Sequence, residues 1–405
     1  MNIWKQKTIY LDHASATPLS SGVVRVMNDV EKKTSGANPS AIYDRGVLTR
    51  GFIDDSRGSI AKSLSAHSNE IIFTGSGTES DALTVIGVVR AYTGKGIPHI
   101  VITKIEHSAI LENCRMLESR NEAEVTYIDI DENGIVNPKD IRDVLKENTI
   151  LVSVMYANNE IGTIQPIEEI AKEIRYYRKN NNSKYPLFHT DACQAMNYLF
   201  TENIEKLGVD LMTFNGSKIY GPKGVGVLYK KRGVDIAPLY AGGGQEFGLR
   251  SGTENVSGIV GIGYALLEAS RIKKYESSRL TKLRDYGIKK LKTLAEESEY
   301  KITINGDQKN RLPNNINISI ADISSELLVI ELGAKGILVS EKSACGSNDD
   351  GMSHVITALR HAQGLPINKN EGSVRISLGR STIKKDIDRF IRILNSILQK
   401  YKQWK

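Results

Sequence analysis

Short apolar runs alternate with longer helical stretches through the first half of the chain. Two of the helical stretches cover residues 79–92 and 108–119. The apolar runs have the length and composition of buried strands and lie at residues 70–74, 99–103, 125–128, 150–155 and 186–190. Strands that alternate with helices in this way predict an α/β domain with a mainly parallel sheet.

A different pattern begins near Gly258. A helical stretch runs from this residue with few breaks past Leu294, and short strand-like runs follow at residues 315–319 and 373–377. One long helix followed by short strands indicates a second, smaller α+β unit.

The length of the chain supports the same division. With 405 residues, it exceeds what one hydrophobic core usually supports. We therefore expect a large domain over residues 20–262 and a small domain that residues 1–19 and 263–405 build together.

The final helical stretch places basic residues around an apolar stripe. The apolar positions are Ile387, Phe390, Ile391, Leu394 and Leu398, and the basic positions are Lys384, Lys385, Arg389 and Arg392. We interpret this stretch as a helix docked on the core, because cations near a helix C-terminus interact favourably with the helix dipole. A tail that docks on a partner protein is the alternative.

Composition fits an ordinary soluble protein, with 40% hydrophobic and 25% charged residues. No apolar stretch reaches the roughly 18 residues that a membrane span needs. The first seven residues lack the apolar segment of a secretion signal, so we expect a cytoplasmic protein without a membrane partner. The net charge of +7 is spread along the chain, which gives little support to an acidic partner and less to a nucleic acid.

Three cysteines are too few and too scattered for a disulfide framework, and none forms a pair with metal-binding spacing. Cys114 and Cys193 lie in contexts typical of buried cysteines. Cys345 differs, because it lies among small polar residues at positions 343–350 that indicate a flexible loop. A thiol on such a loop is a candidate nucleophile, and no metal is expected.

Lys218 lies in a tight glycine-rich turn, residues 217–224, between two apolar runs. A rigidly seated amine of this kind suits a Schiff base with an aldehyde cofactor.

Small residues mark the end of one predicted strand and the start of a helix at residues 73–81. Free backbone N–H groups there, at Gly77 and its neighbours, together with the Thr78 hydroxyl, predict an anion site suited to phosphate. A plain helix cap explains the same residues equally well.

Asp191 follows the apolar run 186–190, so its carboxylate emerges at the C-terminal end of a buried strand. A carboxylate there can hold the protonated nitrogen of a pyridine ring, and an Asp that caps the next helix is the alternative. Gln194 lies one helical turn further on and can reach the same ligand.

Three more residues are candidates with simpler alternatives. His107 stands where a helix begins and can stack on an aromatic cofactor or move a proton, or it can be structural. The amide of Asn158 can bind a ligand oxygen or form a turn. The guanidinium of Arg375 suits an α-carboxylate if it faces the site, and otherwise it faces solvent.

With these residues in view, the chain closely resembles the NifS/IscS-type cysteine desulfurases, which are pyridoxal-phosphate enzymes of the aminotransferase class V kind. The resemblance runs from residue 10 to residue 380, and its most specific stretches are residues 158–162, 218–224, 242–246 and 249–255. It implies the fold type I of pyridoxal-phosphate-dependent transferases, with a mainly parallel seven-stranded sheet and a smaller α+β domain that carries the Cys345 loop.

The resemblance also implies a role for each candidate. Lys218 would bond to the cofactor, Asp191 would bind the ring nitrogen, His107 would stack on the ring and Gln194 would lie near the ring hydroxyl. Gly77, Thr78 and Ser217 would hold the phosphate, together with Thr253 from the other subunit of a homodimer. Asn158 would contact the cofactor and, with Arg375, the carboxylate of L-cysteine.

Cys345 would take sulfur from the substrate as a persulfide, leaving L-alanine. The resemblance then implies donation of that sulfur to a partner protein, either an iron–sulfur scaffold or a tRNA-thiolation protein, without direct contact to nucleic acid.

Some residues depart from the family pattern. Ser217 stands where a histidine usually precedes the lysine, and Asn215 where a serine is common. Ala82 replaces an asparagine, Tyr43 replaces a histidine, and Glu341-Lys342 replaces a small pair before the cysteine motif. We expect the first change to weaken cofactor binding, because a cationic donor is lost.

We therefore predict a cysteine desulfurase. A second class V enzyme, either a selenocysteine lyase or an aminotransferase, is the first alternative, and Cys345 would be dispensable in it. A non-catalytic scaffold that binds partners through its basic C-terminal helix is the other.

Overall fold

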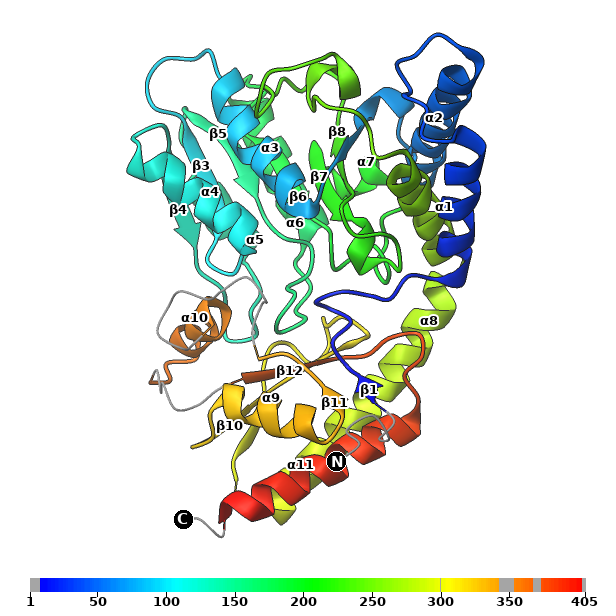
Figure 1. Cartoon of the computed structure of the whole chain (residues 1–405). Coiled ribbons are helices and arrows are strands. Elements are labelled where there is room, and N and C mark those ends of the chain that lie inside the picture. Colours follow the sequence, from blue (N-terminus) through cyan, green and yellow to red (C-terminus); the bar gives the residue numbers. More distant parts are fainter. Residues whose placement is uncertain (1–7, 299, 342–352, 367–372, 403–405) are drawn as a thin grey trace.

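The structure of the chain is a computed structural model that describes residues 8–298, 300–341, 353–366 and 373–402 (Figure 1). Its main element is a seven-stranded sheet with the strand order β2-β8-β7-β6-β5-β3-β4. Its strands are β2 (Ile71–Thr74), β3 (His99–Thr103), β4 (Glu124–Ile128), β5 (Thr149–Ser153), β6 (Leu187–Asp191), β7 (Leu211–Asn215) and β8 (Gly226–Lys230). Only β8 runs antiparallel to its neighbours β2 and β7, which confirms the predicted mainly parallel sheet.

The central strands are apolar without alternation because helices cover both faces of the sheet. Every residue of β3, β5 and β6 is buried. On one face, α3 (Gly77–Ala91) and α4 (Ser108–Ser119) bury Leu83, Val88, Ile110 and Leu117 against the strands. On the other face, the cores of α2 (Asp44–Leu64), α6 (Ile167–Asn180) and the first part of α8 (Val256–Glu297) join one large cluster.

The remaining short elements complete this unit. They are α1 (Ser21–Thr34), α5 (Pro138–Asp143) and α7 (Ile204–Leu207), with the 3-10 turns η2 (Ser68–Glu70), η3 (Gly216–Lys218) and η4 (Gln245–Gly248). Within the described ranges, no helix has both the length and the hydropathy that crossing a membrane requires.

The long helix α8 joins two layers of the molecule (Figure 1). Its first part packs on the large sheet, whereas Leu280, Leu291 and Leu294 belong to a second core. With 42 residues, α8 is about 60 Å long. The predicted boundary at residues 262/263 falls inside this helix, and the domain boundaries stay a prediction.

The second core lies between helices and two small sheets. One sheet is antiparallel with the order β12-β10-β9, and the other pairs β1 with β11 in parallel. These elements are β1 (Ile9–Tyr10), β9 (Ile302–Ile304), β10 (Asn315–Ile320), β11 (Ile337–Leu338) and β12 (Ser373–Ser377), with α9 (Ser325–Ala334) and α11 (Lys384–Lys402). Ile387, Phe390 and Leu394 of α11 are buried in this core, which confirms the core-docked interpretation of the final helix.

One helix from the C-terminal part of the chain contributes to the core of the large unit instead. Helix α10 (His354–Ala362) buries Val355, Ile356 and Leu359 in the same cluster as α2 and α6. Figure 1 shows α10 apart from α9 and α11, beneath the strands β3 and β4. Helix α10 therefore belongs to the large unit, whereas β11 before it and β12 and α11 after it belong to the small one.

Candidate active site

The candidate residues follow the C-terminal ends of neighbouring parallel strands. Gly77 comes after β2, His107 after β3, Asn158 after β5 and Lys218 after β7, while Asp191 ends β6. Because the C-terminal ends of parallel strands lie at one edge of a sheet, the fold brings these residues together there. Open α/β sheets bind their ligands at this edge.

Lys218 ends the 3-10 turn η3, and this turn needs its glycines. Gly221 N–H donates to Gly216 O at 2.9 Å, and a Cβ on Gly216 would lie 2.4 Å from Pro222 O. The Lys218 ammonium donates to two backbone carbonyls, Ala14 O at 2.9 Å and Ser15 O at 2.5 Å. Burial lowers the pKa of this amine, although the nearby Cys193 and Asp191 act in the opposite direction. The amine is thereby easier to deprotonate than an exposed lysine.

Asp191 is buried among other acidic groups. Its Oδ1 accepts a hydrogen bond from Cys193 N–H at 2.8 Å. Burial, and then the charge of Asp191, raise the pKa of Asp81 well above its usual value. Burial also raises the pKa of Glu106 to about 8. A site with this much acidic character favours a ligand that brings a protonated nitrogen.

His107 is the N-cap of α4. Its Nδ1 accepts a hydrogen bond from Ala109 N–H at 3.1 Å, so the proton of the neutral ring lies on Nε2. Burial lowers the pKa of His107, which keeps the ring neutral near pH 7. A neutral flat imidazole suits the predicted stacking role, which stays a prediction.

The start of α3 presents backbone rather than side chains. A Cβ on Gly77 would lie 2.8 Å from Asn215 Nδ2 and 3.0 Å from Cys193 Sγ, so no larger residue fits there. The Ser76 hydroxyl caps Glu79 N–H, and the N–H groups before it remain for a ligand. Thr78 in the first turn is exposed. This arrangement fits a phosphate group.

The side chain of Ser217 donates its hydroxyl proton to another residue of the protein. Its hydroxyl donates to Asn215 Oδ1 at 2.9 Å. That bond leaves the amide of Asn215 as the side-chain donor beside Gly77, with a long contact of 3.4 Å to Cys193 Sγ. The unusual Ser217 and Asn215 thus act as a pair, which sequence reasoning about single positions did not predict.

Arg375 faces the site and not solvent, because only 1% of the residue is exposed. Its Nη2 donates to Asp12 Oδ1 at 2.9 Å and to Ser15 Oγ at 2.6 Å. Gln194 Nε2 donates to Ala14 O at 2.9 Å. The segment after β1 therefore contacts Lys218, Gln194 and Arg375, and no periodic pattern in the sequence indicated this role.

The amide of Asn158 is occupied within the fold. Its Oδ1 accepts from Glu160 N–H and Ile161 N–H, and its Nδ2 donates to Ile105 O at 3.0 Å. These bonds favour the turn-forming interpretation of Asn158, and its contact with a ligand stays a prediction.

The structure describes only one of the other two predicted residues. Thr253 is exposed on the segment before α8, as a residue that reaches a second subunit would be. Cys345 and Lys342 lie outside the described residues. On the far side of that stretch, His354 Nε2 donates to Glu106 O at 2.9 Å, next to His107.

Taken together, the residues present fit pyridoxal phosphate. Lys218 offers an amine whose pKa burial lowers, Asp191 a carboxylate, His107 a neutral ring and the first turn of α3 an opening for phosphate. The mutual electrostatic influence of Lys218, Asp191 and His107 indicates that the three lie close together.

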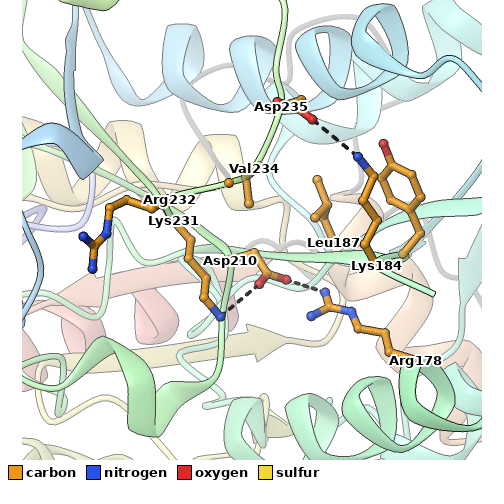
Figure 2. A pocket seen from close by; sticks show the side chains of 10 residues that line it. Arg178, Lys184, Leu187, Asp210, Lys231, Arg232, Val234 and Asp235 are labelled. Carbon is orange, nitrogen blue, oxygen red and sulfur yellow. Dashed lines mark hydrogen bonds and ion pairs between the residues drawn. The ribbon is translucent and has the colours of Figure 1, made fainter. Parts of the chain in front are cut away.

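Two surface cavities lie elsewhere. One, of about 230 Å³, is at the opposite edge of the large sheet, where Arg178 and Lys231 point toward Asp210 and Lys184 points toward Asp235 (Figure 2). The other, of about 520 Å³, lies between α8 and the start of α11. Neither cavity includes any of the predicted site residues.

Comparisons with known proteins show the family of this chain. The family model described as aminotransferase class V matches residues 9–390. Relatives named cysteine desulfurase IscS, from Dictyoglomus turgidum and Methanosarcina thermophila, are each 42% identical, over 99% and 98% of this chain and 98% and 93% of their own lengths. A solved NifS-like protein is 32% identical with a TM-score of 0.87, over 97% of this chain and all of that one.

A second solved structure, of a NifS-like protein from Rickettsia africae, is 29% identical with a TM-score of 0.82, over 97% of this chain and all of that chain. These similarities extend over both cores of the fold, and not over the sheet alone.

Proposed function

This chain belongs to the class V aminotransferase family, and from that premise we propose that it works as a cysteine desulfurase with pyridoxal phosphate as its cofactor. The observation that carries the proposal is the meeting of Lys218, Asp191 and His107 at the C-terminal edge of the sheet, with the buried Arg375 brought to the same place by the segment after β1.

The residues divide the work of holding the cofactor. The first turn of α3 and the Asn215 amide would hold the phosphate, Asp191 would hold the ring nitrogen, and His107 would cover the ring. Gln194, which donates to Ala14 O, would contact the ring hydroxyl. When bound, pyridoxal phosphate supplies an aldehyde for the substrate amine and a ring that withdraws electrons.

Lys218 is the proton carrier that the site favours. Because burial lowers the pKa of Lys218, its Nζ gives up a proton readily and can take one from the substrate carbon. His107 keeps a proton on Nε2 and can donate it toward a leaving group. Arg375 would hold the carboxylate of the substrate and thereby fix the orientation of the reacting carbon.

Cys345 would then receive the sulfur. Its thiolate attacks the substrate sulfur, the new S–S bond forms as the C–S bond breaks, and the carbon fragment takes up a proton and leaves as L-alanine. One L-cysteine and one thiol give one L-alanine and one persulfide, so the step needs no external oxidant. We propose that the persulfide is handed to a sulfur-accepting protein, an iron–sulfur scaffold or a tRNA-thiolation protein, in the cytoplasm.

We also propose a homodimer. Large apolar side chains are exposed on and before α2 and on η4, with exposed fractions of 97% for Ile42, 60% for Val47 and 56% for Phe247. Arg57 joins the two segments, because it pairs with the buried Glu246 and lies 5.1 Å from the ring of Phe247. Such a surface is typical of an interface, and Thr253 would reach the second subunit's phosphate site from it.

Absorbance and product assays test the function. A band near ~420 nm, the signature of this cofactor on a lysine, should change when L-cysteine is added, and wild type should release alanine and sulfide under reducing conditions. Cys345→Ser should bind cofactor but release neither product at an appreciable rate.

Two other results would point elsewhere. Alanine release that persists in Cys345→Ser would indicate another class V enzyme. A protein that takes up no pyridoxal phosphate would overturn the enzymatic proposal. Sedimentation of wild type and Val47→Asp tests the dimer, and a wild-type monomer would contradict it.

A further inference from the structure

Among the described residues, Arg375 is the largest side chain that the fold buries completely. Two of its nitrogen atoms have partners: Nη2 bonds Asp12 and Ser15, and Nη1 donates to Asn159 O at 3.0 Å. Its Nε is buried and has no hydrogen-bond partner within the described ranges. A buried N–H without a partner is costly unless a ligand completes it.

Asp12 and Ser15 belong to one tight turn that leaves β1. Ser15 N–H donates to Asp12 O at 3.1 Å, and Ser15 Oγ donates to Asp12 Oδ1 at 2.9 Å. Ala14 N–H donates to Ser377 Oγ on β12 at 2.9 Å. The turn is therefore fixed by its own hydrogen bonds and by the strand that carries Arg375.

The same turn also holds the amine of Lys218. Its carbonyls Ala14 O and Ser15 O accept both hydrogen bonds that the structure gives to Lys218 Nζ. Four consecutive residues, 12–15, thus bind a guanidinium through their side chains and an ammonium through their backbone.

We propose that Asp12 and Ser15 are positioning residues for recognition of the substrate. They orient the guanidinium of Arg375 so that its Nε–H is left for the α-carboxylate, while the carbonyls of the same turn locate the Lys218 amine. The turn thereby sets the distance between Arg375 and Lys218. This distance determines the separation of carboxylate and amine in the substrates that the site accepts, and it selects α-amino acids over β-amino acids. This inference rests on the proposed function, because it needs a substrate that uses both groups.

The charges involved explain why both partners are needed. The side chain of Asp12 is 20% exposed and that of Arg375 only 2%, so Asp12 is the partner that can exchange with water. A guanidinium with a single partner turns about its long side chain, whereas three partners on two nitrogens fix its plane.

A competing role for Asp12 makes the opposite prediction. If Asp12 only occupied Arg375 until a substrate carboxylate displaced it, removal of Asp12 would free the guanidinium, and carboxylate ligands would bind more tightly. If Asp12 positions Arg375, its removal weakens their binding.

Ligand titration of the holoenzyme separates these roles. The absorbance change on adding L-alanine, β-alanine or ethylamine gives the dissociation constant of each, and ethylamine is L-alanine without its carboxylate. For Ser15→Ala and Asp12→Ala, we expect the dissociation constant of L-alanine to rise by about tenfold or more, the size of one lost hydrogen bond to a charged group. The dissociation constant of ethylamine should stay within about twofold of its wild-type value. The preference for L-alanine over β-alanine should fall.

Kinetics give an independent measurement. Ser15→Ala should raise KM for L-cysteine with little change in kcat, because the lost contact acts in binding. The matched control is Asp285→Ala, which removes an acid beside another buried arginine outside the site, because Arg284 Nε donates to Asp285 Oδ1 at 2.9 Å. Asp285→Ala should leave the dissociation constants of all three ligands unchanged.

Several outcomes would overturn the inference. Tighter L-alanine binding in Asp12→Ala would show that Asp12 has the competing role. Unchanged L-alanine binding in both variants would make the turn purely structural. An equal loss of affinity for ethylamine would indicate general damage to the site. Thermal unfolding checks that each variant folds, and Ser15→Ala alone decides the question if Asp12→Ala does not fold. A wild-type protein that takes up no cofactor overturns the proposed function itself, whereas wild-type binding without these variant effects overturns only this inference.

Discussion

Opposite edges of the large sheet carry two clusters of acidic and basic side chains that are organised in opposite ways. At the N-terminal edge, Asp210 pairs with Arg178 and lies 3.8 Å from Lys231 (Figure 2). There the basic groups reach solvent, with 55% of the Lys231 side chain exposed. At the C-terminal edge, Lys218 and Asp191 are largely buried and bond to backbone groups rather than to each other.

This difference separates a structural cluster from a functional one. Paired and partly exposed charges satisfy one another and leave little for a ligand to gain. Buried charges without a direct partner shift their pKa values, as burial does for Lys218, His107 and Glu106. A charged cofactor or substrate can supply the missing partners of these buried groups, which is why such clusters mark functional sites.

The largest expected effect is loss of the amine in Lys218→Ala. Alanine release should fall by more than about a thousandfold, because a covalent and proton-carrying group has no substitute in the site. The control is Lys231→Ala at the other edge, which should stay within about twofold of wild type since it removes only a partly exposed partner. Initial rates of alanine release measure both variants. Comparable losses of activity in the two would contradict the functional difference between the edges.

Asp191 at one edge and Asp210 at the other should show opposite effects on activity and stability. Asp191→Asn should lower activity by about a hundredfold, the usual scale of lost acid–base support, with little change in the free energy of unfolding. Asp210→Asn should lower the free energy of unfolding by about 2 kcal/mol, discounted because its basic partners reach solvent, and leave kcat unchanged.

Urea unfolding and steady-state kinetics on the same preparations test these opposite effects. Each variant serves as the control for the other. If Asp191→Asn destabilised the protein as much as Asp210→Asn did, the C-terminal cluster would be structural as well.

A smaller effect is expected at the phosphate end of the site. Asn215→Ala should raise the dissociation constant of pyridoxal phosphate by about tenfold, the scale of one hydrogen bond to a charged group. Ser217→Ala should change it less, because the hydroxyl of Ser217 donates to Asn215 Oδ1. Binding of pyridoxal, which lacks the phosphate, should not respond to either change. An equal or larger effect of Ser217→Ala would make Ser217 the direct donor.

The last expected effect concerns the dependence of stability on pH. Burial raises the pKa of Glu106 to about 8 from a usual 4.5, so the folded state holds a proton that the unfolded state releases. Its contribution to stability is complete below about pH 4.5 and is lost as pH rises toward 8, at up to about 1.4 kcal/mol per pH unit. Between pH 4.5 and 8, the free energy of unfolding of Glu106→Gln should fall less than that of wild type. Parallel plots of this free energy against pH would contradict the role of Glu106.

The local elements of the fold were predictable because each carries its own pattern. The buried strands around Ile100 and Leu151 read as continuous apolar runs, and α4 begins and ends as its period predicts. Burial of Cys114 and Cys193 also follows from their neighbours in the chain. The family resemblance added the seven-stranded sheet and the identity of the cofactor.

What only the tertiary structure decided are contacts between residues far apart in sequence. The pattern near Asp12 and Ser15 indicated no role for them, yet the turn meets Arg375 some 360 positions later. The burial of α10 in the core of the large unit belongs to the same class. Periodicity reports which face of an element is buried, whereas the partner of a buried charge depends on how distant segments pack together. The sequence therefore determined the elements and the chemical groups of this protein, and the fold decided which of those groups hold one another in place.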